Sequence, residues 1–500
     1  MKKILFIVML IISLFNISCQ NNSSSSIGSI GEIVVDPYGL TPLSAVYTTE
    51  TVNTAPITVT VKGLYGEPDI IHTYPAGYGT EFEIHGMFPE SENIIEVNDG
   101  GRIITKNVTV GQLKFNNGNA IPKQLNIEIN NLPDEKYTNN PELYFINFSS
   151  PAETIAVSRN GYIRYNGKAY TYKIINYNKT IMRYSDANKL YTLLGKDIVK
   201  FPTSSHHDTI NINNDFLYLS SSSYGSQDKL IEINSLGIQN KSLSFGKLIE
   251  NSLDLNTYKE DEAVFKQIAF GEDLNNIYIE NGQQKSIDWC HANSIVYDSY
   301  ADILYVSSRH RGVMAIDYSE WKLIWWMADE TLATQVPNYI PYDIHFKDLK
   351  SLEAYRVKGD AINDGPKNQH ALFLFANGNL GMFDNQGDKD SNSEGSRYIE
   401  YKITGSHGNW TAQKVDEYRD ASLYSRITSD VDLTGENYQN MIITYGTART
   451  IIEMNKSTKD ILFKLVVPSI VSHIYRSDKM PLYYDEGRVY SEDCNLKNAN

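Results

Sequence analysis

The sequence predicts an all-β protein in which a small β-sandwich domain precedes a β-propeller. Short runs of alternating apolar and polar residues recur along the chain, and polar turns separate them. The 500 residues include 35 tyrosines, and Asn, Ser and Ile are also plentiful, which favours strands and turns. Segments that contain His206 and His207, His291, and His370 recur at spacings of about 80 residues, close to the length of two propeller blades.

The composition excludes two classes of protein. After the N-terminal segment, no apolar run is long enough to cross a bilayer, although 41% of the residues are hydrophobic. The net charge of −15 argues against a nucleic-acid partner. It does not exclude an anionic small molecule, because a local arginine can outweigh the global field at contact distance.

The N-terminal residues 1–18 are expected to form a secretory signal, because two lysines precede an apolar run and small residues follow it. Cys19 then resembles the lipidation site of bacterial lipoproteins, although Asn16 stands where a branched apolar residue is usual. A plain signal peptide with a chance Cys is the alternative. Residues 19–30 would be a flexible tether. We therefore expect an exported protein, either periplasmic or held at a membrane by a lipid anchor only.

Residues 31–115 are predicted to form the β-sandwich domain. Apolar and polar residues alternate at 57–61 (ITVTV) and 82–85 (FEIH), as expected for strands with one buried face. The turn-forming sequence GLYGEP at 63–68 separates two such runs. This pattern is typical of a small antiparallel sandwich.

Residues 116–500 are predicted to form the propeller. The clearest strands are expected at 161–165, 216–220, 303–307, 380–383 and 441–445. From about residue 140 onward, roughly 360 residues accommodate six to eight four-stranded blades, and the residues alone leave the number open. Residues 254–265 and 343–355 are expected to hold short helices or loops inserted between blades.

One predicted hairpin carries the strongest candidate site. The segment 288–294 (DWCHANS) opens it and 307–310 (SSRH) closes it, so His291, Asn293 and Arg309 lie at the same end. A guanidinium presents a rigid fork of donors to an oxyanion, and an imidazole exchanges protons near neutral pH. This set suits chemistry on a phosphate, sulfate or carboxylate group.

Two further histidine segments are expected to converge on the same axis. His207, in 206–208 (HHD), and His370 each stand near the start of a predicted strand. Together with His291 they could bind zinc, but the nearby Arg309 would repel a cation, and we expect no metal. His310 follows Arg309 directly and is expected to face away from the site.

The other cysteines carry less information. Cys290 is expected to be a small buried residue rather than a nucleophile, and whether it pairs with Cys494 stays open.

Seven motifs, in order, resemble those of the bacterial aryl-sulfate sulfotransferase family. They are HHD at 206–208, DWCHANS at 288–294, SSRH at 307–310, QH at 369–370, FDN at 383–385, SRYIEY at 396–401 and ITS at 427–429. The sequence GMFPESEN at 86–93 also looks like the small sandwich domain of that family. The resemblance covers most of the chain after residue 200.

The resemblance implies a six-bladed propeller after the sandwich, in the periplasm and often as a homodimer. It also implies sulfuryl transfer from an aryl sulfate to a phenol, without a cofactor or nucleotide sulfate donor. His370 matches the nucleophile that becomes sulfated. The surrounding site residues are matched by His207, His291, Asn293, Arg309 and Thr428. His206 is an alternative to His207.

One departure from the family concerns disulfide chemistry. Its best-known members carry a close Cys pair shortly before the nucleophilic His, whereas this chain has no Cys between Met327 and His370. A dependence on disulfide formation is therefore not expected here.

The residue types support the same chemistry independently. A neutral imidazole is repelled less than a carboxylate by a sulfate ester and would give a labile N–S bond, which implies ping-pong kinetics. Three alternatives stay open: a propeller hydrolase or lyase acting on a phosphate or carboxylate, a sulfatase, and a non-catalytic lipoprotein that serves as a binding scaffold.

Overall fold

A computed structural model describes residues 30–134, 138–185, 188–221, 227–270, 279–280, 283–284, 288–332, 345–387, 394–488 and 490. Several expectations lie outside these residues, namely the signal over 1–18, lipidation at Cys19, nearly all of the tether and any role of Cys494. Among the described residues, no helix is both long and apolar enough to span a bilayer.

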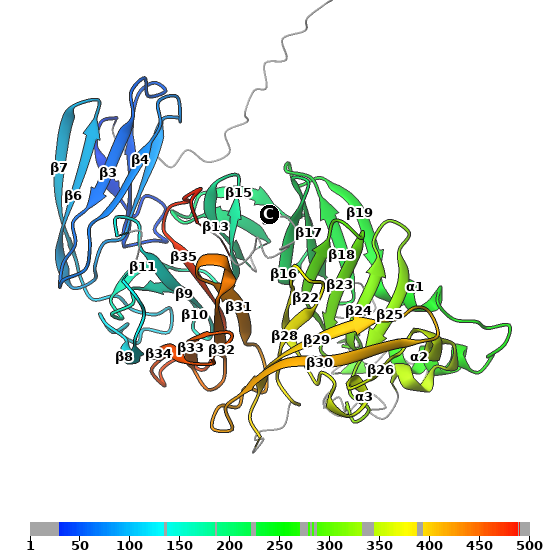
Figure 1. Cartoon of the computed structure of the whole chain (residues 1–500). Helices are drawn as coiled ribbons and strands as arrows, with labels where there is room; N and C mark the ends of the chain where they lie inside the picture. Colours follow the sequence, from blue (N-terminus) through cyan, green and yellow to red (C-terminus); the bar gives the residue numbers. More distant parts are fainter. Residues whose placement is uncertain are drawn as a thin grey trace, which may run out of the picture.

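The N-terminal domain is a sandwich of two antiparallel sheets (Figure 1). One sheet consists of β1 (Ile33–Val35), β2 (Ser44–Thr48) and β5 (Glu81–His85). The other sheet consists of β4 (Ile70–Tyr74), β3 (Ile57–Val61), β6 (Ser91–Asp99) and β7 (Arg102–Val110). In β3, Ile57, Val59 and Val61 are buried, as the alternating sequence predicts.

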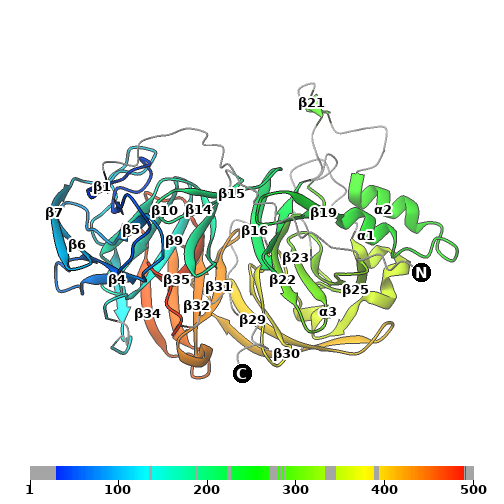
Figure 2. The same ribbon diagram turned by 90° about the horizontal axis from the view of Figure 1, so that it is seen from above.

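Six sheets follow within the described residues and form the blades of a propeller (Figure 2); four of them are antiparallel and four-stranded, and two carry a fifth strand. The first three, each given from the innermost strand outward, are β35 (Ile474–Pro481), β9 (Glu142–Ser149), β10 (Ala152–Val157) and β11 (Ile163–Gly167); β12 (Thr171–Tyr177), β13 (Thr180–Ser185), β14 (Lys189–Thr192) and β15 (Asp197–Lys200); and β16 (Ser205–Ile212), β17 (Asp215–Ser220), β18 (Lys229–Ile233) and β19 (Gln239–Ser244).

The last three blades carry most of the insertions. Their strands are β22 (Ala292–Asp298), β23 (Ile303–Ser308), β24 (Gly312–Asp317) and β25 (Lys322–Met327); β27 (His370–Leu374), β28 (Leu380–Asp384), β29 (Arg397–Thr404), β30 (Trp410–Arg419) and the added β26 (Val357–Gly359); and β31 (Asp430–Thr434), β32 (Asn440–Tyr445), β33 (Thr450–Asn455), β34 (Ile461–Val466) and the added β8 (Asn126–Asn130).

Short helices and one small hairpin connect these strands. They are α1 (Phe245–Glu250), α2 (Asp261–Phe270), β20 (Ile279–Glu280), β21 (Gln283–Gln284), η1 (Phe346–Asp348), η2 (Lys350–Tyr355), α3 (Ala361–Asp364) and η3 (Glu436–Tyr438). The all-β class, the sandwich and the propeller are confirmed, and the blade number is six.

The C-terminal strand closes the propeller. β35 pairs with β9, so the first blade combines strands from opposite ends of the domain. The innermost strands then contact one another in a closed ring, in the order β35, β12, β16, β22, β27 and β31. Closure brings the N-terminal ends of these six strands together around one axis.

Polar side chains link neighbouring blades near this axis. The Asp208 Oδ2 atom accepts a hydrogen bond from the Ile295 backbone N–H at 3.0 Å, and Ser294 Oγ accepts one from the Leu372 N–H at 2.9 Å. Asp208 also lies 3.3 Å from Lys173 Nζ and 3.5 Å from Arg476 Nη1. One buried carboxylate therefore connects its own blade with three others.

The sandwich packs directly against the first blade. The buried Arg164 Nε donates to the Gly86 carbonyl at 2.8 Å, and the His85 backbone N–H donates to Tyr483 Oη at 2.8 Å. Apolar residues of both domains, such as Ile84 and Phe145, share one core. The two domains therefore share a continuous interior.

The contacts of the Asp208 carboxylate predict a large loss of stability when this side chain is truncated. Asp208→Ala should lower the free energy of unfolding by about 3–5 kcal/mol, because it leaves the buried Arg476 charge without this partner. Asp215→Ala, at the other end of the β16–β17 hairpin, is the control and should cost less than about 1 kcal/mol. Urea denaturation measures both, and equal costs would contradict the assignment.

Candidate functional site

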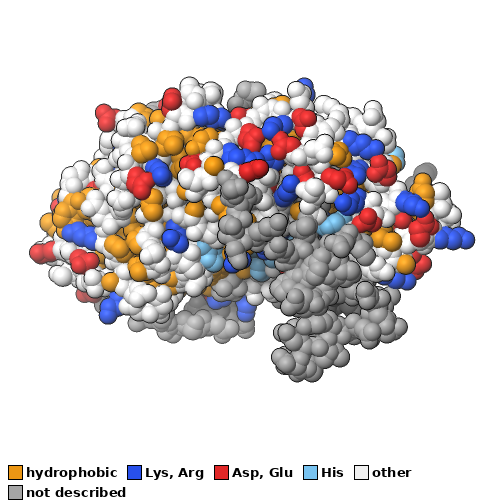
Figure 3. Space-filling view, turned by 90° about the horizontal axis from the view of Figure 1, so that it is seen from below, with side chains coloured by type: hydrophobic (Ala, Val, Ile, Leu, Met, Phe, Trp, Pro, Cys, Tyr) orange, Lys and Arg blue, Asp and Glu red, His pale blue; other side chains and the backbone are white. Residues whose placement is uncertain are grey.

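Three histidines meet at the axis of the propeller. His207 lies in β16, His291 directly precedes β22, and His370 is the first residue of β27. The His207 ring centroid lies 5.3 Å from that of His291 and 6.3 Å from that of His370. Figure 3 shows histidine side chains near the middle of the face seen from below, with Lys and Arg side chains close by.

Irregular backbone at the strand starts places these side chains. His207 and His291 have positive φ angles of 55° and 50°, and Ala371, next to His370, has a φ of 50°. The strand register shifts at each of these places, as it does at a β-bulge. Such angles are strained by about 1–3 kcal/mol for residues other than glycine, and the packed ring of strands holds them in place.

His370 is held as a neutral ring with a defined free nitrogen. Its Nδ1 atom lies 2.7 Å from Asn385 Oδ1, and Asn385 Nδ2 donates to the carbonyls of Ser425 (2.7 Å) and Thr428 (3.2 Å). Because both amide protons are engaged, the Asn385 oxygen accepts from His370 Nδ1–H. Burial, with the nearby Arg309 charge, lowers the pKa of His370 to about 3. At neutral pH, His370 Nε2 therefore carries a lone pair.

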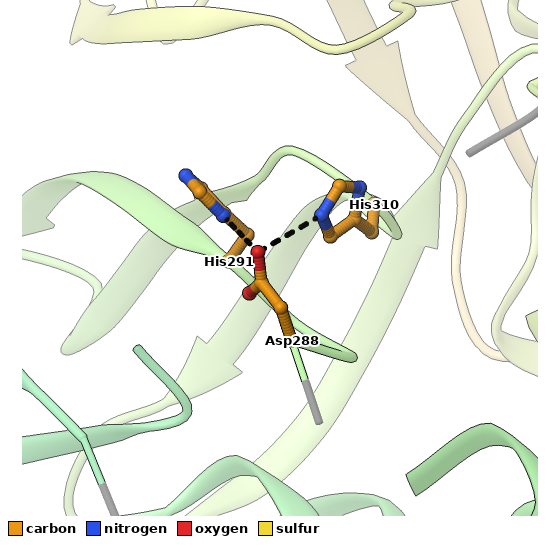
Figure 4. Close-up of side chains that lie close together, drawn as sticks. All are labelled: Asp288, His291 and His310. Carbon is orange, nitrogen blue, oxygen red and sulfur yellow. Dashed lines mark hydrogen bonds and ion pairs between the residues drawn. The ribbon is translucent and has the colours of Figure 1, made fainter. Parts of the chain in front are cut away.

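His291 is held by a carboxylate (Figure 4). Asp288 Oδ2 lies 2.5 Å from His291 Nδ1 and 3.4 Å from His310 Nε2. Burial opposes the charge of Asp288, but His291 and His310 outweigh it and hold the pKa of this carboxyl below its usual range. The carboxylate therefore orients two rings at once.

The position of His310 corrects the expectation that it faces away from the site. β23 ends at Ser308, so the alternation of side chains along a strand does not extend to His310. Its ring is buried and its centroid lies 5.2 Å from that of His291. Burial lowers the pKa of His310 to about 4 despite the Asp288 carboxylate.

Asn293 and Arg309 fix the segments that carry the histidines. Asn293 Nδ2 donates to the Gln369 carbonyl at 2.8 Å, directly before His370. The Arg309 backbone N–H donates to the His291 carbonyl at 2.9 Å. The Arg309 charge also lowers the pKa of His370. The hairpin thus contributes a cation whose charge acts on His370.

His207, rather than His206, faces the other site histidines. His207 Nε2 lies 3.3 Å from His291 Nε2, and its Nδ1 is hydrogen-bonded to the Tyr475 hydroxyl. Burial holds the pKa of His207 well below its usual range, and the neighbouring His206 acts in the same direction. His206 Nε2 instead lies 3.1 Å from Gln227 Nε2.

Thr428 lies at the same end of the axis, immediately before β31. It has a positive φ of 57°, and its hydroxyl donates to a backbone carbonyl, that of Ile427 (2.6 Å) or Ile474 (2.9 Å). Its own carbonyl accepts from Asn385. In this conformation Thr428 supports the segment behind His370.

A buried charged layer lies next to the rings. Arg476, beside Tyr475 in β35, lies 3.5 Å from both Asp208 and Asp430. Asp430, Asp432 and Asp478 also gather here, and burial raises the pKa of all three carboxyls. Arg476 adds to the forces that keep the rings of His207 and His370 neutral.

Cys290 lies behind the site as a buried free thiol, 3.6 Å from Ser308 Oγ. Burial raises the pKa of Cys290, so it is not a nucleophile at neutral pH.

Sequence reasoning did not single out Tyr475, Arg476 or Asn385 as site residues. Asn385 stands within a matched motif, but no role was predicted for it, and nothing in the sequence around Tyr475 distinguishes it from other strand tyrosines. Both act through partners far away in the sequence.

Comparison with known families covers most of the chain. A family described as "Arylsulfotransferase (ASST)" matches residues 129–476, and its "Ig-like domain" matches residues 32–110. Two proteins named arylsulfate sulfotransferase AssT are similar, one from Escherichia coli (28% identical over 185 residues) and one from Lelliottia amnigena (31% over 160 residues). These matches cover 34% and 29% of this chain, and only 30% and 26% of those proteins.

Solved structures show more distant likeness. A Bacteroides caccae protein of unknown function is 9% identical, with a TM-score of 0.39, over 68% of this chain and 99% of that one. The Cps50 (Swd1) β-propeller domain of Myceliophteria thermophila is 9% identical, with a TM-score of 0.34, over 69% and 87%.

The lowered histidine pKa values predict that the histidines destabilise the folded protein in mild acid. Below about pH 6.5 the unfolded chain takes up protons that these folded histidines refuse, so their contribution to the free energy of unfolding should fall as the pH decreases towards 4, while the raised pKa values of Asp430, Asp432 and Asp478 contribute in the opposite direction. His310→Gln removes one imidazole that takes up such a proton when the chain unfolds. The slope between pH 4 and 6.5 should then become shallower by up to ~1.4 kcal/mol per pH unit. Urea denaturation at several pH values measures it, and an unchanged slope would refute the assignment.

Proposed function

This chain belongs to the arylsulfotransferase family, and we propose that it transfers a sulfuryl group from a phenolic sulfate ester to a phenolic acceptor. The observation that carries this proposal is the state of His370. Its ring is neutral, its Nδ1–H is donated to Asn385, and its Nε2 lone pair remains for attack. A neutral nucleophile suits an anionic ester because charge repulsion is small.

The reaction proceeds in two half-reactions through His370. Nε2 forms a bond to sulfur while the bond between sulfur and the phenolic oxygen breaks, and the bonding pair leaves on that oxygen. A second phenol then attacks sulfur, and the N–S bonding pair returns to His370. Since the first phenol leaves before the second reacts, ping-pong kinetics and a sulfohistidine intermediate are expected. The donor supplies its own sulfuryl group, so no cofactor is required.

Arg309 supplies the charge that this transfer needs. Its charge acts on His370 and lowers the pKa of that ring, and its guanidinium would contact the sulfuryl oxygens during transfer. Asn293 and Thr428 support the segments on either side of His370 and would complete the binding of these oxygens. His207 or His291 would protonate the departing phenolate and deprotonate the acceptor.

The N-terminal sequence supports a proposal for where in the cell this activity takes place. We propose export to the periplasm, with a lipid on Cys19 as the membrane anchor, because a charged and apolar signal precedes that cysteine. Phenols and their sulfate esters are the proposed small-molecule partners. A homodimer is proposed from the family resemblance alone.

Release of nitrophenolate from 4-nitrophenyl sulfate tests the proposed activity. The parent should release it only when a phenol is added, and His370→Ala should lower the rate by about 10³-fold or more, because the nucleophile is lost. Mass spectrometry of the parent with donor alone should show one added sulfuryl group. His407→Ala, in the exposed turn between β29 and β30, is the matched control and should resemble the parent.

Other results would support other functions. Release without phenol would indicate a sulfatase, and no release from a folded parent would favour a binding scaffold. Equal rates for the parent and His370→Ala would remove His370 from the mechanism.

The role of Arg309 predicts a selective loss of kcat. Arg309→Met should lower kcat by about 10²–10³-fold, because the guanidinium acts most strongly on charge that develops in the transition state. Arg309→Lys keeps the charge and should lose less. Steady-state kinetics at saturating acceptor separate kcat from KM. If only KM rises, Arg309 binds the substrate and the transition state equally.

A further inference from the structure

We infer that His291 is the group that exchanges the proton with the phenol, and that Asp288 is the residue that positions it for this task. This inference rests on the proposed sulfuryl transfer, and it decides between His291 and His207 as the general acid and base. Three observations support it, and each concerns the hydrogen bonds around these rings.

The first observation is the orientation of His291. Asp288 Oδ2, at 2.5 Å, accepts from His291 Nδ1–H, so the ring presents Nε2 on its opposite side, towards His207 at the axis (Figure 4). A carboxylate in this position fixes the tautomer and compensates the positive charge that the ring carries when protonated. Among the described residues, no comparable carboxylate is bonded to a ring nitrogen of His207, whose two ring nitrogens face Tyr475 and His291.

The second observation is the role of His310. It lies 3.4 Å from the same Asp288 oxygen through Nε2, and its Nδ1 is buried without a hydrogen-bond partner among the described residues. A single proton on Nε2 satisfies this arrangement, so His310 donates to Asp288 as a neutral ring. It thus keeps the carboxylate directed at His291 without adding a competing positive charge.

The third observation is that the Tyr475–His207 pair can follow the proton of His291. When His291 is neutral, His207 Nε2–H donates to His291 Nε2, and the Tyr475 hydroxyl donates to His207 Nδ1. When His291 is protonated, its Nε2–H donates to His207 Nε2, and His207 Nδ1–H donates to the Tyr475 oxygen. His207 stays neutral in both states, as its burial requires.

The proton balance of both half-reactions closes with His291 alone. In the first, protonated His291 gives its Nε2 proton to the departing phenolate, while His370 becomes sulfated and keeps its Nδ1 proton. In the second, neutral His291 takes the proton of the acceptor phenol as the phenol oxygen attacks sulfur. The released His370 and the protonated His291 are then ready for the next donor.

The test compares two donors that differ in how much their leaving group needs a proton. The value of kcat/KM for the donor reports the first half-reaction, measured with 4-nitrophenyl sulfate and with phenyl sulfate and a fixed concentration of 1-naphthol as acceptor. Asp288→Asn should lower kcat/KM for phenyl sulfate by about 100-fold or more. For 4-nitrophenyl sulfate the loss should stay below about tenfold, because nitrophenolate departs without a proton.

Matched variants separate positioning from a merely structural role. Asp288→Glu keeps the charge and should restore much of the activity on phenyl sulfate. Asp317→Asn, at the far end of β24 in the same blade, should leave both donors unaffected. If Asp288→Asn does not fold, His291→Gln should show the same difference between the donors.

Each remaining outcome overturns a distinct statement. An equal loss on both donors, in Asp288→Asn or in His291→Gln, would overturn the inference while sulfuryl transfer by the parent stands. A parent that transfers from neither donor would overturn the proposed function, and the inference with it.

Discussion

Closure of the inner ring of strands is the constraint on which the site depends. The pairing of β35 with β9 joins the two ends of the propeller domain, and only then do six innermost strands surround one axis. His207, His291 and His370 come from three different blades, and Tyr475 comes from the closing strand itself. A propeller that lacked this pairing would keep its blades but lose the partner of His207 and the charge of Arg476.

The closed ring also accounts for the electrostatics of the site. The imidazoles of His207 and His370 are buried and therefore stay neutral, and Arg476, with Arg309 in the case of His370, reinforces this state. Under the proposed function, neutral rings beside fixed positive charge would suit an anionic ester, since a neutral nucleophile would not be repelled and the transferred group would be stabilised. The carboxylates around Arg476 balance its charge without contacting the rings of the site. Asp208 is linked to the site only through the backbone, because it accepts from the Ile295 N–H in the strand that follows His291.

Strain and polar contacts are concentrated at the strand starts. Positive φ angles at His207, His291, Ala371 and Thr428 recur in four blades and coincide with interruptions of the regular pairing or with strand ends. Hydrogen bonds from neighbouring blades or segments hold the chain at or next to several of these residues, as Asn293 holds the Gln369 carbonyl and Asn385 holds that of Thr428. Backbone strain of this kind persists where the surrounding structure over-determines it, which is typical of functional sites.

The sequence by itself determined the all-β class, the division into sandwich and propeller, and the histidine and arginine segments. Alternating patterns such as that of β3 and the short motifs around His291 and His370 are local, so they can be read along the chain. It did not determine which ring faces the axis, the place of His310 beside Asp288, or the partners Asn385 and Tyr475. Those depend on bulges that break the two-residue alternation and on contacts between strands that are far apart in the sequence, such as Tyr475 with His207. Only the closed ring of blades decides them, because the partners meet only when the propeller closes.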